Sequence, residues 1–187
     1  MDPVGKVSSN EREDERIAPP ASKPAPPCTL VIFGAHGDLT KRLLTPALYN
    51  LLGGGLLDKQ FKVIGVDRVD GSDESWREEL GQTMQEFTKD PNAEFYTPQI
   101  NQDWWGDLSG RMSYYKADFT DVSQLEGLKS KIDGNAIFYL AVAARFFATV
   151  VENLGKAGLT KQTDDAFRRI VVELSLIHIS EPTRRRG

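Results

Sequence analysis

The sequence predicts an α/β protein with a doubly wound parallel sheet, and three observations lead to this prediction. Short apolar runs alternate with amphipathic helical patterns between residues 28 and 173. The first apolar run, residues 30–33, passes through a glycine turn directly into a helical pattern. The fourth run, residues 136–142, is almost entirely apolar, as expected of a strand that helices cover on both faces. This alternation favours parallel strands joined by right-handed crossovers.

Each element can be placed by its pattern. We expect strands at residues 30–33, 61–66, 112–117, 136–142 and 169–173. We expect helices at residues 39–52, 72–89, 121–132 and 146–154, with a short one around residues 104–105. Ser72 and Asp121 are the expected N-caps, because their side chains can accept from amides of the first turn. A sheet with these strands is incomplete at its edge, where backbone groups lack a partner strand.

The first helix has two open features. Its apolar residues are expected to pack on the sheet, and the glycines at 53–55 are expected to end it. Pro46 either starts the main helix with Thr45 as its cap or kinks a longer helix. The apolar residues assigned to the buried face are Leu39, Leu43, Leu44, Ala47, Leu48, Leu51 and Leu52.

Composition narrows the class of protein. The chain has 187 residues, 40% hydrophobic and 27% charged, which is ordinary for one globular domain. The net charge of −4 offers no basic surface for nucleic acid or an anionic membrane. Cys28 is the only cysteine, so an internal disulfide is excluded and we expect no metal site and a reducing cytoplasm. No apolar run approaches the roughly 20 residues of a membrane-spanning helix.

The first 27 residues form a separate segment. They contain no apolar stretch of the kind that a signal peptide needs. They are rich in Pro and Ala towards their end, with the run APPASKPAPP. We therefore expect residues 1–27 to be a disordered arm and the folded domain to span residues 28–173.

The turn after the first strand is the candidate binding site. Gly34 and Gly37 suit a backbone that turns sharply or lies against a ligand. Lys41 and Arg42 lie near the positive end of the helix dipole, where cations are favourable if an anion shares the site. Residues 34–41 are therefore predicted to bind phosphate, although the turn could instead only connect two elements. The spacing G-x-x-G meets neither the Walker A pattern nor G-x-G-x-x-G, so this is a variant of a Rossmann-like loop.

The end of the second strand decides between two coenzymes. A carboxylate there accepts hydrogen bonds from the ribose 2′-hydroxyl of NAD, whereas an arginine accommodates the 2′-phosphate of NADP. This sequence has both, in Asp67 and Arg68. Charge alone leaves the choice between NAD and NADP open.

Four motifs in order resemble the glucose-6-phosphate dehydrogenase family. Residues 34–42, GAHGDLTKR, resemble its GASGDLAKK nucleotide loop, and residues 64–68, IGVDR, resemble its G-x-A-R strand end. Residues 138–142, FYLAV, resemble its FYLA(L/V)PP segment. Residues 169–173, RIVVE, resemble the start of its RIIVEKPFG motif. The resemblance covers residues 28–173.

The resemblance implies an activity and a set of binding residues. The family transfers a hydride from C1 of glucose 6-phosphate to NADP, and sometimes NAD, giving 6-phosphogluconolactone in the pentose phosphate pathway. Arg68 would meet the 2′-phosphate, and Tyr139 with Ala141 would lie near the nicotinamide half. The residues implied against the pyrophosphate are Gly34, Ala35, His36, Gly37, Asp38, Leu39, Thr40 and Lys41.

Three departures from the family pattern bear on these roles. His36 replaces a small Ser or Thr, and we interpret it as tolerated in the loop, although it could donate to a phosphate. Asp67 stands where the family often has Ala, which weakens the preference for NADP over NAD. Ala143 and Ala144 replace a Pro-Pro pair, which puts a rigid turn in doubt.

The sequence after Glu173 leaves the family pattern. The family continues Lys-Pro-Phe-Gly, whereas this chain continues Leu-Ser-Leu, and residues 174–187 resemble translated sequencing-adapter read-through. We therefore expect a non-family tail, no substrate domain and no catalytic histidine, so that this chain is inactive as written. Subunit contacts are then expected only in a full-length homo-oligomer. The alternative is a non-catalytic module that binds dinucleotide.

Overall fold

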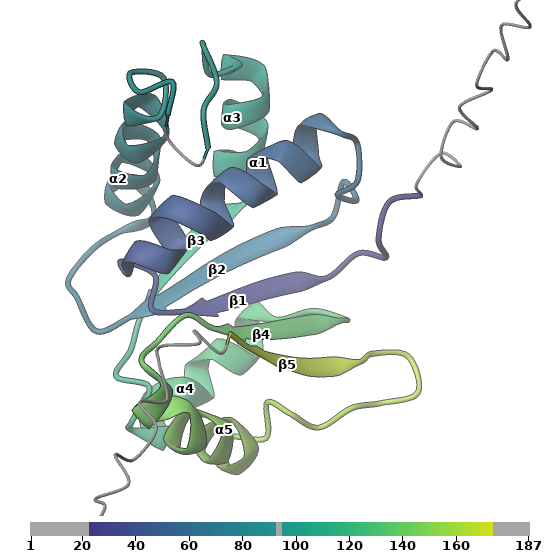
Figure 1. Ribbon diagram of the computed structural model, residues 1–187. Coiled ribbons are helices and arrows are strands. Elements are labelled where there is room, and N and C mark those ends of the chain that lie inside the picture. Colours follow the sequence, from purple (N-terminus) through teal and green to yellow (C-terminus); the bar gives the residue numbers. More distant parts are fainter. Residues whose placement is uncertain (1–22, 93–94, 174–187) are drawn as a thin grey trace, which may run out of the picture.

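The computed structural model describes residues 23–92 and 95–173 (Figure 1). Within these ranges five strands form one parallel sheet in the order β3-β2-β1-β4-β5. The strands are β1 (Thr29–Phe33), β2 (Lys62–Asp67), β3 (Met112–Lys116), β4 (Ala136–Leu140) and β5 (Arg168–Val172). The α-helices are α1 (Thr45–Gly53), α2 (Asp73–Glu86), α3 (Gln102–Gly110), α4 (Val122–Glu126) and α5 (Phe147–Lys156). The predicted Rossmann-like, doubly wound parallel sheet is confirmed.

Helices cover both faces of the sheet. Figure 1 shows α1, α2 and α3 on one face and α4 and α5 on the other. Alternate residues of each strand enter two separate cores, so that Ile32 faces α1 and Phe33 faces α5. All five residues of β1 are buried, because β1 is the central strand and has a helical layer above and below it.

The strand order places several chain ends close together. Phe33 is in register with Val66 of β2 and with Leu140 of β4. The residues that follow these three positions therefore meet at the carboxyl edge of the sheet. The chain winds from β1 towards β3 on one side and from β4 towards β5 on the other, so this edge contains the topological switch point, where open α/β sheets bind ligands.

The first helix is longer than its α-helical part. Asp38 and Leu39 already have helical backbone, and a π-helical turn at Thr40–Leu44 leads into α1. In this turn the amide of Thr45 donates to the carbonyl oxygen of Thr40, and the Thr45 hydroxyl donates to the same oxygen over 2.8 Å. The wide turn precedes Pro46, whose ring would crowd the carbonyl four residues earlier in a regular helix. Of the two predicted roles for Pro46, the perturbation of a longer helix is the one observed.

The predicted buried face of this helix is partly wrong. Leu43, Ala47 and Leu51 are exposed, with Leu43 and Leu51 each 38% exposed, and the buried residues of α1 include Leu48 and Tyr49. The seven apolar positions span more of the helix circumference than one packing face, so hydrophobicity alone could not identify the side that meets the sheet. The predicted end is confirmed, because α1 stops at Gly53 and Gly55 has a φ of +68°.

The other elements match their predictions within a few residues. Ser72 caps α2 in a capping box with Ser75, and Asp121 caps α4 by accepting from the amide of Ser123. The helix expected at 121–132 is α4 followed by a 3₁₀ helix at Gly127–Lys131. The strand expected at 136–142 pairs only as far as Leu140, beyond which the chain turns away from the sheet.

Two predicted segments fall largely outside the described residues. These are the arm, for residues 1–22, and all of the tail at 174–187. The rest of the arm is described, and there the amide of Ala25 donates to the carbonyl oxygen of Leu56 over 3.2 Å. In the described part of the chain no helix has the length and apolar character needed to cross a membrane.

Candidate functional site

Gly34 connects the ends of three strands. Its amide donates to the carbonyl oxygen of Val66 over 2.9 Å, and its φ of +93° is one that side-chain-bearing residues rarely adopt. A Cβ at this position would overlap the carbonyl oxygen of Ala141. The turn after β1 therefore requires glycine, and it lies directly against the segment that follows β4.

The loop then enters a helix whose first backbone amides can donate hydrogen bonds to a ligand. The buried hydroxyl of Thr40 donates to the carbonyl oxygen of Gly34 over 2.8 Å and fixes the turn. Asp38 and Leu39 lie in the first helical turn, where backbone amides have no intrahelical acceptor. Among the described residues neither amide donates to an acceptor elsewhere in the chain. The start of this helix thus combines free donors with the positive end of the dipole, which suits an anion such as phosphate.

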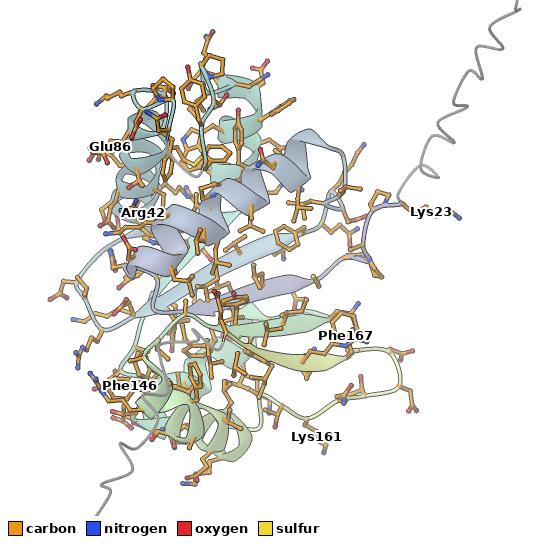
Figure 2. The ribbon with its side chains drawn as sticks, viewed as in Figure 1. Lys23, Arg42, Glu86, Phe146, Lys161 and Phe167 are labelled. Carbon is orange, nitrogen blue, oxygen red and sulfur yellow. The ribbon has the colours of Figure 1, made fainter. Side chains whose placement is uncertain are left out.

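The two cations of the loop already have carboxylate partners. The ammonium nitrogen of Lys41 lies 2.6 Å from Oε1 of Glu79, and Nε of Arg42 lies 3.9 Å from Oδ1 of Asp38. Figure 2 shows Arg42 at the start of the helix, on the side of the sheet that α2 covers. These pairs provide a partner for the positive charges within the protein. Because of these ion pairs, the positive charges of Lys41 and Arg42 do not by themselves indicate a bound anion.

His36 is held by two carboxylates. Its amide donates to Oδ2 of Asp67 over 3.1 Å, and its ring nitrogen Nδ1 lies 2.5 Å from Oε2 of Glu79. The other ring nitrogen, Nε2, is buried and has no partner among the described residues. Although burial raises the pKa of Glu79, hydrogen bonds from Lys41 and His36 outweigh it and lower that pKa below its usual value. The imidazole therefore ties the loop to α2.

The end of β2 carries two charged side chains, Asp67, which accepts hydrogen bonds, and Arg68, which is exposed. The carboxylate of Asp67 accepts from the amide of His36 and, over 2.8 Å, from the amide of Arg68. Arg68 is exposed and forms no ion pair within the described residues. Its guanidinium lies near enough to Asp118 to contribute, after the hydrogen bonds from Thr120, to the lowered pKa of that carboxyl. A charged, unpaired guanidinium is thus available at this edge.

The ends of β4 and β5 meet on the other side of β1. The hydroxyl of Tyr139 donates to Oε2 of Glu173 over 2.6 Å, and burial together with this bond raises the pKa of Tyr139 to about 12. A cavity of about 470 Å³ opens beside this pair, within the range of small-molecule sites. Its lining joins the start of the first helix to the segment after β4 and includes Asp38, Leu39, Leu43, Ala141, Val142, Phe147 and Glu173. In Figure 2, Phe146 lies at this carboxyl end of the sheet, whereas Phe167 lies at the opposite end.

Comparison with known protein families identifies the family to which this domain is similar. Residues 31–178 match the family described as "Glucose-6-phosphate dehydrogenase, NAD binding domain". The chain belongs to the glucose-6-phosphate dehydrogenase family. The match contains every residue of the loop and both strand ends described above, and it ends within the segment predicted to be a non-family tail.

Individual members of the glucose-6-phosphate dehydrogenase family give the same result. The chain is 33% identical over 160 residues to glucose-6-phosphate 1-dehydrogenase of Chlamydia pneumoniae, which covers 79% of this chain and 30% of the relative. It is 33% identical over 156 residues to the enzyme of Leuconostoc mesenteroides. A crystal structure of the Mycobacterium avium enzyme superposes with a TM-score of 0.67 at 30% identity, covering 80% of this chain and 30% of the other. The chain thus spans about 30% of the length of the relatives it matches.

The site residues predicted from sequence fall into two groups. Asp38, Leu39 and Ala141 share the cavity beside β4, with Tyr139 bonded to its lining residue Glu173. His36 and Arg68 lie instead at the end of β2, where Asp67 contacts the backbone of both. Gly34 stands between the two groups and contacts both strand ends. This division fits an extended ligand with two halves, which is the shape of the dinucleotide that the family domain binds.

Sequence reasoning missed Glu79, which contacts two predicted residues. Glu79 is one of several acidic residues in α2, and no motif distinguishes it from its exposed neighbour Glu78. Its position three residues after the buried Trp76 places it on the side of α2 near the loop, but that direction required the packing of α2 to be known. Among the described residues no group of three or more His, Cys, Asp or Glu side chains is arranged to hold a metal ion.

Proposed function

We propose that this chain is the coenzyme-binding part of an NADP-dependent glucose-6-phosphate dehydrogenase. The enzyme would oxidise glucose 6-phosphate at C1 to 6-phosphogluconolactone, with NADP as the hydride acceptor. The observation that carries this proposal is the position of Gly34, which admits no side chain and brings the start of the first helix against Ala141. The family match supports the activity.

The residues present fit a dinucleotide. The amides of Asp38 and Leu39 would donate to the pyrophosphate, aided by the helix dipole, within the proposed binding segment of Gly34, Ala35, His36, Gly37, Asp38, Leu39, Thr40 and Lys41. Tyr139 and Ala141 would lie near the nicotinamide half, beside a cavity that the bound coenzyme can enter. The hydroxyl of Tyr139 is fixed by Glu173, so its role would be to shape this end of the site.

The choice of NADP depends on Arg68. Its exposed guanidinium has no ion pair in the described part of the chain, so it can form a charge-assisted contact with a 2′-phosphate. Asp67 supports NAD as a second coenzyme, because a carboxylate at this position accepts from the ribose hydroxyls. Two backbone amides already occupy Asp67, which favours Arg68 as the dominant contact.

We propose further that these 187 residues bind coenzyme without catalysing the reaction. Removal of the C1 hydroxyl proton needs a general base, usually histidine. The sequence contains two histidines, and the ring of His36 is held by Glu79 away from such a role. His178 lies outside the described residues. Glucose 6-phosphate binding and homo-oligomerisation would then belong to a longer family protein. The single cysteine, Cys28, is buried and free, which supports our proposal of a cytoplasmic location.

One observation favours a second candidate function, that of a module that binds dinucleotide and catalyses no reaction. It is the absence of an available histidine base among the described residues. The two candidates differ in the native sequence expected after residue 173. Resequencing the locus gives the native sequence that follows residue 173. Expression of the chain with that continuation should restore oxidation of glucose 6-phosphate under the first candidate only.

The coenzyme proposal is tested by titrating the purified chain with NADP and NAD. We expect saturable binding of NADP, weakened about 10- to 100-fold by Arg68→Ala, the range for a lost charge-assisted hydrogen bond. NAD affinity should be unchanged in that variant. Lys161→Ala, which removes an exposed charge near the opposite edge of the sheet, is the matched control. Equal weakening of both coenzymes by Arg68→Ala would count against the phosphate contact.

A further inference from the structure

The carboxylate of Glu79, which the proposed function does not use, contacts two residues of the proposed binding segment, Lys41 and His36, and the three form a cluster. Its two oxygens divide between two loop residues, with Oε1 at 2.6 Å from Nζ of Lys41 and Oε2 at 2.5 Å from Nδ1 of His36. All three side chains are partly buried, with 34% of Glu79, 26% of Lys41 and 20% of His36 exposed. Partial burial strengthens the pairing relative to a fully solvated ion pair.

This pairing occupies the donors that the loop offers. Lys41 has its charge neutralised by a carboxylate within hydrogen-bond distance. His36 directs Nδ1 to Glu79 and leaves Nε2 buried, so neither ring nitrogen is open to a ligand. A phosphate approaching this side of the loop would meet a carboxylate that already holds both side chains. It would have to displace Glu79 or bind beside its negative charge.

The cluster lies where a dinucleotide site distinguishes its ligands. His36 contacts Asp67 at the end of β2 through its amide, and its ring packs edge-on against Tyr114 at a centroid distance of 5.2 Å. The carboxylates of Asp67 and Glu79 therefore flank one residue at the strand end that recognises the 2′-position of the adenosine ribose. Burial raises the pKa of the nearby Tyr114 hydroxyl, and the charges of Asp67 and Glu79 add to this effect.

We propose that Glu79 is a specificity-determining residue that disfavours a ribose 2′-phosphate and thereby reduces the selectivity for NADP set by Arg68. This inference rests on the proposed dinucleotide function. Glu79 acts in two ways, by holding Lys41 and His36 as its own partners and by repelling a phosphate dianion. NAD lacks the 2′-phosphate, so Glu79 can affect its binding only through the pyrophosphate, and the affinity for NAD should change less.

The test compares Glu79→Gln with Glu78→Gln in the 187-residue chain. Glu78 is the exposed neighbour on α2, so the control removes the same charge from the same helix without breaking the cluster. The affinities of NAD and NADP are measured by calorimetry, together with 5′-AMP and adenosine 2′,5′-bisphosphate, which report the adenosine end alone. We expect Glu79→Gln to tighten binding of the two 2′-phosphorylated ligands roughly tenfold, as for removal of a nearby like charge, and to change the affinities for NAD and 5′-AMP much less.

A second variant tests whether the tighter binding in Glu79→Gln comes from the released Lys41 side chain. In the double variant Lys41→Met with Glu79→Gln, the part of the gain that comes from the released ammonium should disappear. Glutamine retains hydrogen-bonding groups near both partners, and NAD binding that persists in Glu79→Gln shows that the loop is intact. If Glu79→Gln behaves like Glu78→Gln, or changes the affinities for all four ligands by the same factor, the inference is overturned while dinucleotide binding stands. If no variant, including the wild type, binds either coenzyme, the proposed function falls with it.

Discussion

The backbone amide of His36 donates to Oδ2 of Asp67 over 3.1 Å, and this bond joins the glycine loop after β1 to the last residue of β2. The same carboxylate accepts from the amide of Arg68 over 2.8 Å. Asp67 therefore holds both the loop and the strand end in place. It does so with oxygens that, in an NAD-specific site, would be directed to the ribose.

Removing the Asp67 carboxylate should destabilise the protein. Asp67→Ala leaves the partly buried amide of His36 without an acceptor, which should lower the free energy of unfolding by about 1–2 kcal/mol. Asp67→Asn keeps one acceptor oxygen and should cost less. Urea denaturation of the two variants and the wild type measures the difference. Equal stability of the alanine and asparagine variants would show that the bond to His36 contributes nothing.

A side chain at Gly34 should be more damaging than one at a glycine in open space. Gly34→Ala combines a φ of +93° with overlap of the Ala141 carbonyl oxygen, and we expect a loss of roughly 2–4 kcal/mol in the free energy of unfolding. Gly106→Ala is the control, because Gly106 lies in α3 with nothing within 4 Å of the added carbon. That change should stabilise the helix by up to about 1 kcal/mol. Chemical denaturation of both variants gives the comparison, and a neutral Gly34→Ala would contradict the described turn.

The protein should lose stability in alkali as Tyr114 ionises. Burial, with the charges of Asp67, Asp70 and Glu79, raises the pKa of Tyr114 from 10.0 to about 12. Because the folded pKa is the higher one, this contribution is complete below pH 10 and is lost as the pH rises to about 12. A pKa difference of about two units corresponds to roughly 2–3 kcal/mol in the free energy of unfolding, and partial solvation of the hydroxyl reduces this value.

The variant Tyr114→Phe isolates this effect. It loses the hydrogen bond that the hydroxyl donates to the carbonyl oxygen of Val69 over 2.6 Å, at a cost of about 1 kcal/mol near neutral pH. Its stability should then fall less steeply than that of the wild type above pH 10. Tyr96→Phe, at a residue that is 43% exposed, should retain the wild-type slope. Urea denaturation between pH 8 and about pH 11.5 measures the slopes, and parallel curves for Tyr114→Phe and wild type would refute the assignment.

The fold was largely predictable because its determinants are local. Apolar runs identify strands that helices cover on both faces, and Ser72 and Asp121 cap their helices as their side chains predict. The exposed side of the first helix was not predictable, since Leu43 and Leu51 are as apolar as the buried Leu48. The partners of Lys41 and His36 were not predictable either. They lie on Glu79, about forty positions further along the chain, and their contact depends on how α2 packs.

Trp76 of α2 also supports the loop that follows β1. This fully buried side chain donates from Nε1 to the carbonyl oxygen of Ala35 over 3.0 Å, and its ring fills the space beside Gly65. Trp76→Phe removes the donor and leaves a buried carbonyl and a small cavity. We expect the free energy of unfolding to fall by about 2–4 kcal/mol.

The same substitution should affect ligand binding, because the freed carbonyl lies within the glycine loop. We expect affinity for both coenzymes to fall by a similar factor, since Trp76 donates to the backbone of Ala35 and not to Asp67 or Arg68, which are proposed to distinguish the two coenzymes. Trp104→Phe is the control, because this tryptophan is 41% exposed and packs on Gly53 and Tyr49; it should cost less stability than Trp76→Phe and change binding little. Denaturation and calorimetry of the two variants decide the matter. A stable Trp76→Phe variant with wild-type affinity would show that the loop holds its shape without support from α2.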